Sequence, residues 1–309
     1  MRIWLALWTV YIVWGSTYLA IRYMVETVPA LLGSGVRFFL AGSIFALWLI
    51  ARRGGLSAMR VSGAELASCA FVGTALLFGG NGLVSVAEDA GTPSGLTALV
   101  VASVPLWVVL FRRLAGDRVA RSTLLWVLLG FLGVAILMLP GERPDDAKVG
   151  GVLIVVAAAF CWATGSFWSS RLRLPRDPIR STSWQMLCGG LVMGVGGLLA
   201  GEAGEVDLAA FSTESVLGFA YLVVMGSLVA FFAYTWLLAN APVSQVATYA
   251  YVNPVVAIGL GALFVGEEVT PLVGVAAIVI VASVAGTIRR EAPRPAVATP
   301  AGEPGRVAS

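Results

Sequence analysis

Histidine is absent from this chain of 309 residues, and charged residues make up only 12% of it. Without histidine, the chain lacks the commonest metal ligand and the commonest proton carrier at neutral pH. Soluble domains carry about twice this charged fraction, so the polar residues here could not cover a surface that faces water. The three cysteines, Cys69, Cys161 and Cys188, lie within apolar runs and are interpreted as small buried residues, which excludes a disulfide framework or a zinc site.

The motifs of several enzyme classes are also missing. The sequence contains no GxxxxGK[S/T] phosphate-binding loop, no HExxH metal site and no serine placed beside a base. We therefore predict no catalytic residue, no cofactor and no metal.

Long apolar stretches fill most of the chain. A helix needs about 20 apolar residues to span the hydrocarbon core of a bilayer, and ten stretches approach or exceed this length. The predicted fold class is an all-α integral membrane protein with ten transmembrane helices. Their predicted spans are 4–22, 30–51, 65–87, 93–112, 122–140, 149–170, 180–200, 214–238, 243–265 and 271–288.

The basic residues fix an orientation for these helices. Cytoplasmic loops of membrane proteins carry an excess of Lys and Arg. If both termini are cytoplasmic, 16 of the 20 basic residues fall in cytoplasmic segments, whereas most acidic residues fall outside. Adding or removing one helix would destroy this alternation, so the charge pattern also supports ten.

The chain contains an internal duplication. The polar loop 141–148 separates a first unit, 1–140, from a second unit, 149–290, and the Pro- and Ala-rich segment 291–309 is predicted to be a disordered cytoplasmic tail. Each unit holds five helices, so the second unit enters the membrane in the opposite sense to the first. Inverted repeats of this kind are typical of secondary transporters. Three matched pairs, each 149 positions apart, carry the comparison: Pro93 and Pro242, Ala98 and Ala247, and Pro105 and Pro254.

An ordered set of short motifs across 4–288 resembles the EamA family of the drug/metabolite transporter superfamily. The motifs are Trp14-Gly15-Ser16-Thr17-Tyr18-Leu19-Ala20, Arg37-Phe38, Asn81-Gly82, Ala87-Glu88, Pro93-Ser94-Gly95 and Gly266-Glu267. The resemblance implies two EamA repeats, a bacterial inner-membrane location and export of small metabolites such as amino acids, or of drugs.

Arg37 is the most informative single residue, because a charge about 10 Å inside a transmembrane helix needs a partner. Glu88 and Glu267 are the predicted partners, at the outer ends of their helices. A structural ion pair, a side chain snorkelling to the surface, a gate and a site for a substrate carboxylate are the alternatives.

The predicted functional residues fall into two groups. Residues for gating or coupling are Arg37, the carboxyl groups of Glu88 and Glu267, and the helix-weakening prolines Pro105 and Pro254. Helix-to-helix packing, an interfacial aromatic belt and static kinks are the structural alternatives. The predicted substrate-binding residues are Trp14, Thr17, Tyr18, Arg37, Asn81, Trp162, Ser166, Tyr234, Tyr249 and Asn253.

The predicted partners are a small-molecule substrate and the lipid bilayer, and not nucleic acid. Gly190 and Gly194 form a small-xxx-small pattern, which is compatible with tight internal packing or with a homodimer. A non-transporting membrane subunit and a membrane-embedded enzyme are the alternatives to a transporter.

Overall fold

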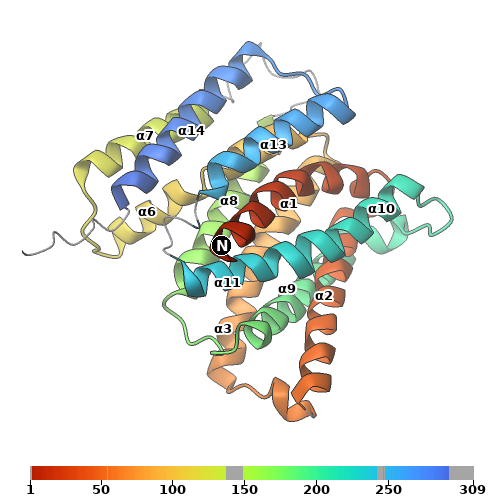
Figure 1. Ribbon diagram of the computed structural model, residues 1–309. Helices are drawn as coiled ribbons and strands as arrows, with labels where there is room; N and C mark the ends of the chain where they lie inside the picture. The colour runs from red at the N-terminus through yellow and green to blue at the C-terminus, as the bar shows by residue number, and fades with distance from the viewer. Residues whose placement is uncertain (1, 54, 137–148, 242–245, 247, 292–309) are drawn as a thin grey trace, which may run out of the picture.

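The computed structural model describes residues 2–53, 55–136, 149–241, 246 and 248–291, and all regular structure in these residues is helical (Figure 1). The predicted loop 141–148 and the tail beyond 291 lie outside the described residues, as do Pro242 and Ala247 of the predicted repeat. The helices in the first half of the chain are α1 (Arg2–Val25), α2 (Ala30–Arg53), η1 (Leu56–Met59), α3 (Gly63–Gly73), η2 (Thr74–Gly82), α4 (Leu83–Asp89), α5 (Ser94–Val101), α6 (Val104–Leu114) and α7 (Arg121–Ile136). The second half contains α8 (Val149–Ser169), α9 (Pro178–Ala200), η3 (Glu202–Glu205), α10 (Thr213–Tyr221), η4 (Leu222–Phe231), α11 (Phe232–Asn240), α13 (Tyr249–Phe264) and α14 (Pro271–Glu291).

Seven helical segments are long and apolar enough to cross a membrane. Three of them join consecutive elements, namely α3 to α4, α5 to α6, and α10 to α11. Three further apolar helices are shorter, at Arg121–Val134, Val252–Phe264 and Pro271–Thr287. Where both ends of a predicted span lie in the described residues, they agree with the observed helix within three residues. The prediction of an all-helical membrane protein is therefore confirmed.

Large apolar side chains cover much of the outside of the bundle. Leu47 is 65% exposed, Leu199 85% and Ile278 71%. Such a surface is unfavourable in water and favourable against lipid tails, which is consistent with a protein that spans a bilayer.

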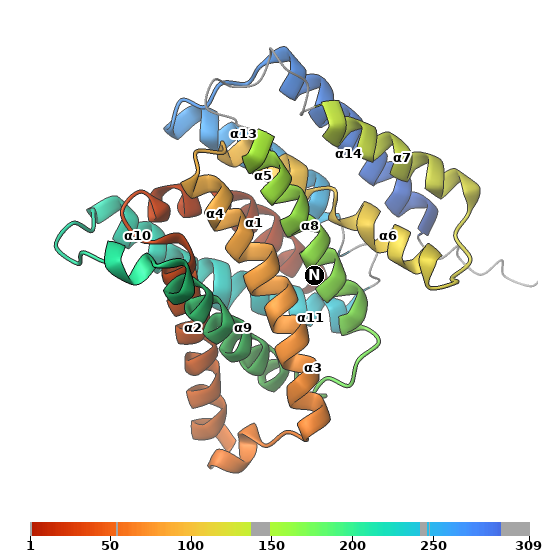
Figure 2. The ribbon, with the colours of Figure 1, turned by 180° about the vertical axis from the view of Figure 1, so that it is seen from behind.

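The helix pair α2 and α9 lies at one side of the bundle and packs through glycines (Figure 2). A Cβ atom at Gly35 would lie 2.6 Å from the backbone nitrogen of Gly194, and one at Gly190 would lie 2.6 Å from that of Phe39. The small-xxx-small pattern of α9 is therefore used inside the chain, where backbones approach closely.

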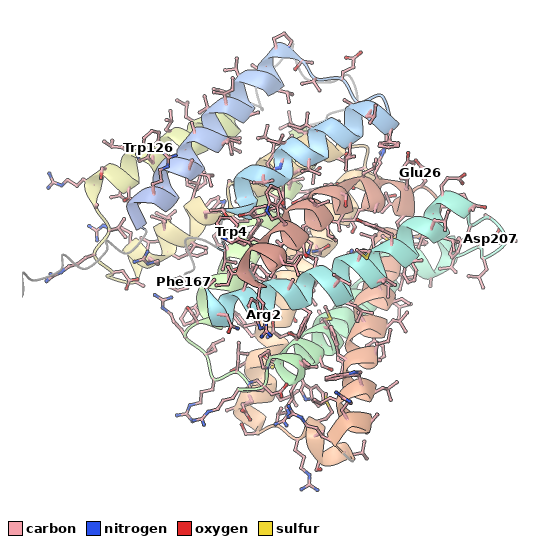
Figure 3. All side chains as sticks on the ribbon, in the orientation of Figure 1. Arg2, Trp4, Glu26, Trp126, Phe167 and Asp207 are labelled. Carbon is pink, nitrogen blue, oxygen red and sulfur yellow. The ribbon has the colours of Figure 1, made fainter. Side chains whose placement is uncertain are left out.

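A second pair, α7 and α14, lies at the opposite side (Figure 1). Ser283 donates a hydrogen bond to the carbonyl oxygen of Trp126 at 2.6 Å. Figure 3 shows Trp126 on this pair, and it shows Glu26 and Asp207 toward one end of the bundle, while Arg2 lies at the other end of α1.

Two transmembrane segments contain a π-helical stretch. One is η2, in the segment from Gly63 to Asp89, and the other is η4, in the segment from Thr213 to Asn240. A π-helix carries an extra residue in each turn, so it widens the helix and often marks a functional position. These segments are the third and eighth in the predicted order, which are equivalent positions in the two units.

Candidate functional site

A small cavity of about 60 Å³ lies between α1, α2, η2, α4, α5, α8 and α13. A cavity of about 15 Å³ can hold one water, so this one has room for several waters or part of a metabolite. It is lined by Trp14, Thr17, Tyr18, Ile21, Arg37, Gly80, Asn81, Val84, Val101, Ala158, Trp162, Tyr249 and Asn253.

Most residues that the sequence predicts for substrate binding meet at this cavity. Ser166 and Tyr234 are the two that do not line it. The Ser166 hydroxyl donates to the carbonyl oxygen of Trp162 at 2.8 Å, within the same helix. Tyr234 packs behind the cavity wall, with its ring centroid 4.8 Å from that of Trp14. That these residues bind a substrate stays a prediction.

Trp14 is the centre of an aromatic cluster. Its ring packs edge to face against Trp162, with centroids 5.7 Å apart, and against Tyr249 at 5.4 Å. Its indole nitrogen donates to the carbonyl oxygen of Gly226 at 3.4 Å. Trp14 and Trp162 come from corresponding helices of the predicted repeat, so related residues of the two units touch each other.

Gly80 allows α8 to approach the π-helical segment η2. A Cβ atom at Gly80 would lie 2.7 Å from the Trp162 ring, which leaves no room for a side chain. The glycine therefore positions Trp162 in the cavity wall.

Among the described residues that line the cavity, Arg37 alone is charged, and only 3% of its surface is exposed. Its Nε donates to the hydroxyl of Ser227 in η4 at 3.0 Å, and its guanidinium carbon lies 4.3 Å from the ring centroid of Phe38. Its Nη1 has no hydrogen-bond acceptor in the part of the chain that the structure describes. A buried guanidinium with an unused donor group is costly unless a ligand or water completes its hydrogen bonds.

The predicted ion pair of Arg37 with Glu88 or Glu267 is not present, because no ion pair among the described residues includes Arg37. Glu267 instead accepts hydrogen bonds from the backbone N–H groups of Ser94 at 2.7 Å and Gly95 at 3.0 Å. Its carboxylate thereby caps the first turn of α5, where free N–H groups and the helix dipole favour a negative charge.

Glu88 is fully buried, and neither of its carboxyl oxygens has a hydrogen-bond partner among the described residues. Its backbone carbonyl accepts from Arg22 at 3.1 Å. Glu88 lies near the C-terminal end of α4, which packs against α1 and α5.

The two predicted amides have different surroundings. The Asn253 amide nitrogen, oriented by its neighbours, donates to the carbonyl oxygens of Tyr249 and Tyr11 at 3.2 Å each. It thus joins α13 to α1. Asn81 is half-buried in η2 and lines the cavity beside Gly80.

The two predicted hinge prolines also differ. Pro105 lies in the first turn of α6, and the transmembrane segment is interrupted before it at Ala102 and Ser103. Pro254 lies inside α13, which continues as one helix to Phe264.

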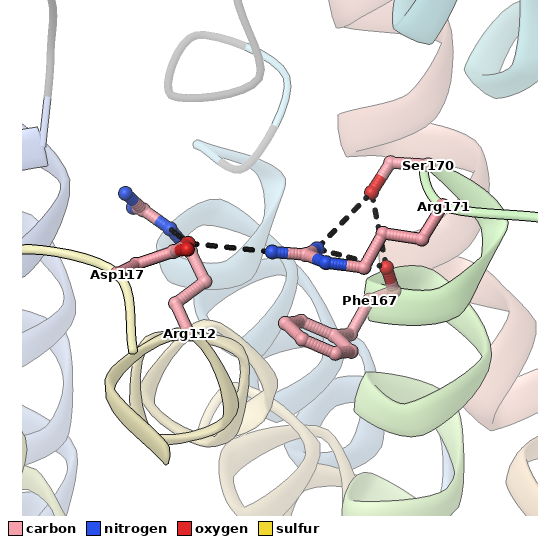
Figure 4. Close-up of polar contacts among 5 residues, drawn as sticks. All are labelled: Arg112, Asp117, Phe167, Ser170 and Arg171. Atoms are coloured by element: carbon pink, nitrogen blue, oxygen red, sulfur yellow. Dashed lines mark hydrogen bonds and ion pairs between the residues drawn. The ribbon is translucent and has the colours of Figure 1, made fainter. Parts of the chain in front are cut away.

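An acidic residue also joins helices at the other end of the bundle (Figure 4). Asp117 accepts from Nε of Arg112 at 3.1 Å and from a terminal nitrogen of Arg171 at 3.3 Å. The Arg171 guanidinium lies 3.7 Å from the ring centroid of Phe167. Gly116-Asp117 and Gly266-Glu267 lie 150 positions apart in the sequence, and each of these two acids joins two helices.

Sequence reasoning missed Ser227, the partner of Arg37. Its signal was present, because Ser227 is the only hydroxyl residue in the apolar run 222–233. Polar groups inside a membrane span face a partner or a cavity.

Comparison with known proteins identifies relatives along most of the chain. The model of the EamA-like transporter family matches residues 1–139 and 149–289. A protein of Escherichia coli (strain K12), named "Uncharacterized inner membrane transporter YedA", is 36% identical over 280 residues, which is 90% of this chain and 88% of that protein. A "Probable amino-acid metabolite efflux pump" of Salmonella typhimurium is 25% identical over 279 residues, covering 88% of this chain and 90% of that protein. A solved crystal structure matches with a TM-score of 0.63 and 21% identity over 92% of this chain and 96% of its own, which indicates a shared fold.

Proposed function

The chain belongs to the EamA-like transporter family, and from this premise we propose that it is a secondary transporter that exports small metabolites across the bacterial cytoplasmic membrane by alternating access. The relatives named as an inner membrane transporter and as an amino-acid metabolite efflux pump support the location and the direction. Seven membrane-capable helices and three shorter apolar helices support a layout of ten spans in two inverted units of five, with both termini cytoplasmic.

The observation that carries the proposal is the cavity at the contact of the two units. Its wall combines Trp14, Arg37 and Asn81 of the first unit with Trp162 and Tyr249 of the second. Inverted-repeat transporters bind substrate between their repeats, near the middle of the membrane. The volume of about 60 Å³ is too small for a whole metabolite, so the substrate must enter by a movement that widens the cavity.

Two polar contacts are the proposed gates. At the predicted outer end, Glu267 holds the N-terminus of α5. At the predicted inner end, Asp117 holds Arg171 at the end of α8. Alternating access requires these contacts to break in turn while the segments around Pro105 and Pro254 bend. Glu88 is the proposed proton carrier, because it is a buried carboxyl group that has no hydrogen-bond partner among the residues the structure describes.

The test is counterflow in proteoliposomes. Vesicles that contain the purified protein are loaded with one unlabelled solute, diluted, and given a trace of the same solute in labelled form. We expect transient, saturable accumulation for one chemical class in a panel of amino acids, organic acids and drugs, measured at two pH gradients. Protein-free vesicles are the control.

Three results would contradict transport. Absence of accumulation for the whole panel, with folded protein, removes the proposal. Chemical conversion of a solute favours the membrane-embedded enzyme. Activity that appears only after a second protein is added favours the membrane subunit.

A further inference from the structure

The charged part of the cavity wall has one sign. Arg37 carries a positive charge, and no Asp or Glu is among the described residues that line the cavity. The Glu267 carboxylate is bound to the N–H groups of Ser94 and Gly95, and Glu88 is not among the described residues that line the cavity. A ligand with one negative charge would therefore make the site neutral.

One donor group of Arg37 is left for such a ligand. Ser227 accepts from Nε, whereas Nη1 has no acceptor among the described residues although the side chain is almost completely buried. A guanidinium presents its N–H groups in a planar fork that matches a carboxylate. A carboxylate in the cavity would therefore satisfy both the charge and the unused donor.

The rest of the wall suits an apolar or aromatic body. The rings of Trp162 and Tyr249 stand edge to face against that of Trp14, and Ile21, Val84, Val101 and Ala158 also line the cavity. Such a mainly apolar surface favours a hydrocarbon group.

The wall offers little to an ammonium group. An α-ammonium stands next to its carboxylate, and so it would lie close to the Arg37 guanidinium and be repelled by it. The amide nitrogen of Asn253 is a donor between α13 and α1, and no carboxylate among the described lining residues attracts an ammonium group. A zwitterionic amino acid would also leave the net positive charge of the site uncompensated.

We propose that the substrate is a small monocarboxylate with an apolar or aromatic body and without an ammonium group, held by Arg37 through its carboxylate. This inference rests on the proposed transport function and names the substrate class of that site.

The experiment compares ligands that differ by one group at pH 7. Binding of 4-methylpentanoate and leucine, and of 3-phenylpropanoate and phenylalanine, is measured on purified protein by quenching of tryptophan fluorescence. The neutral amide of 3-phenylpropanoate completes the series. We expect each monocarboxylate to bind at least about tenfold more tightly than its amino acid and than the amide, because a hydrogen bond to a charged group contributes this much or more.

Variants of Arg37 test whether this residue causes the preference for carboxylates. Arg37→Gln should lower the affinity for 3-phenylpropanoate to that for the amide, and Arg37→Lys should retain part of the difference. Arg52→Gln is the matched control, since Arg52 is an exposed arginine of the same helix. Unfolding temperature and gel filtration establish that each variant is folded.

The outcomes separate this inference from the proposed function. Equal or tighter binding of the amino acids overturns the monocarboxylate class, while counterflow of those amino acids would still support transport. Preference for the carboxylates that persists in Arg37→Gln removes Arg37 as their site. If Arg37→Gln does not fold, the ligand series on the unaltered protein and the Arg37→Lys variant decide the question.

Discussion

Arg37 in α2 and Gln185 in α9 occupy related positions in a packing that the two helices share. A Cβ atom at Gly42 would meet Met186 and Ser183, and one at Gly190, 148 positions later, would meet Phe39 and Gly35. The same shift relates Arg37 to Gln185. The two residues nevertheless behave differently: Gln185 donates to Ser181, one turn away in its own helix, whereas Arg37 reaches across to Ser227 and lines the cavity.

The glycine contacts recur in both helices, as the predicted duplication leads us to expect where backbones pack. The charge does not recur. In the proposed site one guanidinium is enough to hold one anion, and a second buried charge would be costly. The two predicted hinge prolines diverge in the same way, because the segment from α5 to α6 is interrupted before Pro105 whereas α13 continues through Pro254. The proposed layout of two inverted units needs such a difference in conformation, since a transporter is open on one side only.

The substitution Arg37→Gln, which places at position 37 the residue type found at position 185, should have the largest effect on transport. We expect Arg37→Gln to reduce counterflow by about a hundredfold or more, because it removes the charge that the substrate needs. Gln185→Met is the control, and it should leave the rate within about twofold. Full activity in Arg37→Gln would exclude a functional difference between the two positions.

The substitution Gly80→Ala is expected to have the next largest effect, which is on stability. Its Cβ position lies 2.7 Å from the Trp162 ring, and overpacking of a close contact costs about 1–3 kcal/mol. Gly80→Ala should therefore lower the unfolding temperature in detergent. Gly259→Ala, at a helical glycine whose Cβ would meet nothing within 4 Å, should not lower it. An unchanged unfolding temperature in Gly80→Ala would mean that α8 does not pack this closely.

Substitutions of Pro105 and Pro254 test whether the break in the helix before Pro105 affects the transport rate. Pro105→Ala restores a backbone N–H and lets the helix continue through Ala102 and Ser103, so we expect kcat to fall about tenfold with little change in KM. Pro254→Ala should have a smaller effect, since α13 is already continuous. Equal effects of the two substitutions would show that the observed difference is unrelated to turnover.

The carboxyl group of Glu88 has no hydrogen-bond partner within the described ranges, whereas that of Glu267 accepts from two backbone N–H groups. We expect Glu88→Gln to remove the dependence of counterflow on the pH gradient, a change of a few-fold, because an amide cannot carry a proton. The measurement is the initial rate at two pH gradients. An unchanged dependence would exclude Glu88 as an obligatory proton carrier.

The smallest expected effect is on stability, and it comes from changing the polar contacts at the ends of α2 and α9. Glu202 caps α2 through the N–H groups of Leu31 and Leu32, and Asp177 caps α9 and pairs with Arg53. Burial raises the pKa of Asp177, but hydrogen bonds from Arg180 N–H and the Arg53 side chain outweigh it and hold the pKa below its usual value.

A lowered pKa gives the carboxylate a stabilising role above its ordinary pKa, near 4, which is lost as the pH falls through the folded value. Asp177→Asn keeps a good helix cap, so it should cost only about 0.2–1 kcal/mol, the range of an exposed ion pair. Thermal unfolding at pH 7 and at pH 3 should show the difference at pH 7 and little of it at pH 3. If Asp177→Asn destabilises the protein equally at both pH values, the loss of stability comes from the helix cap and not from the ion pair.

Sequence patterns alone predict the helical membrane fold, the positions of most helices and the polar and aromatic residues that line the cavity, but they also include Ser166 and Tyr234, which do not line it. These predictions follow from hydropathy and from the few polar residues inside spans, which are local properties of the chain. The contact of Arg37 with Ser227 and not with a carboxylate, the cap of Glu267 on α5 and the break before Pro105 are known only from the packed structure. These choices depend on how neighbouring helices are rotated and on where π-helical turns widen them, and hydropathy alone carries no information about either.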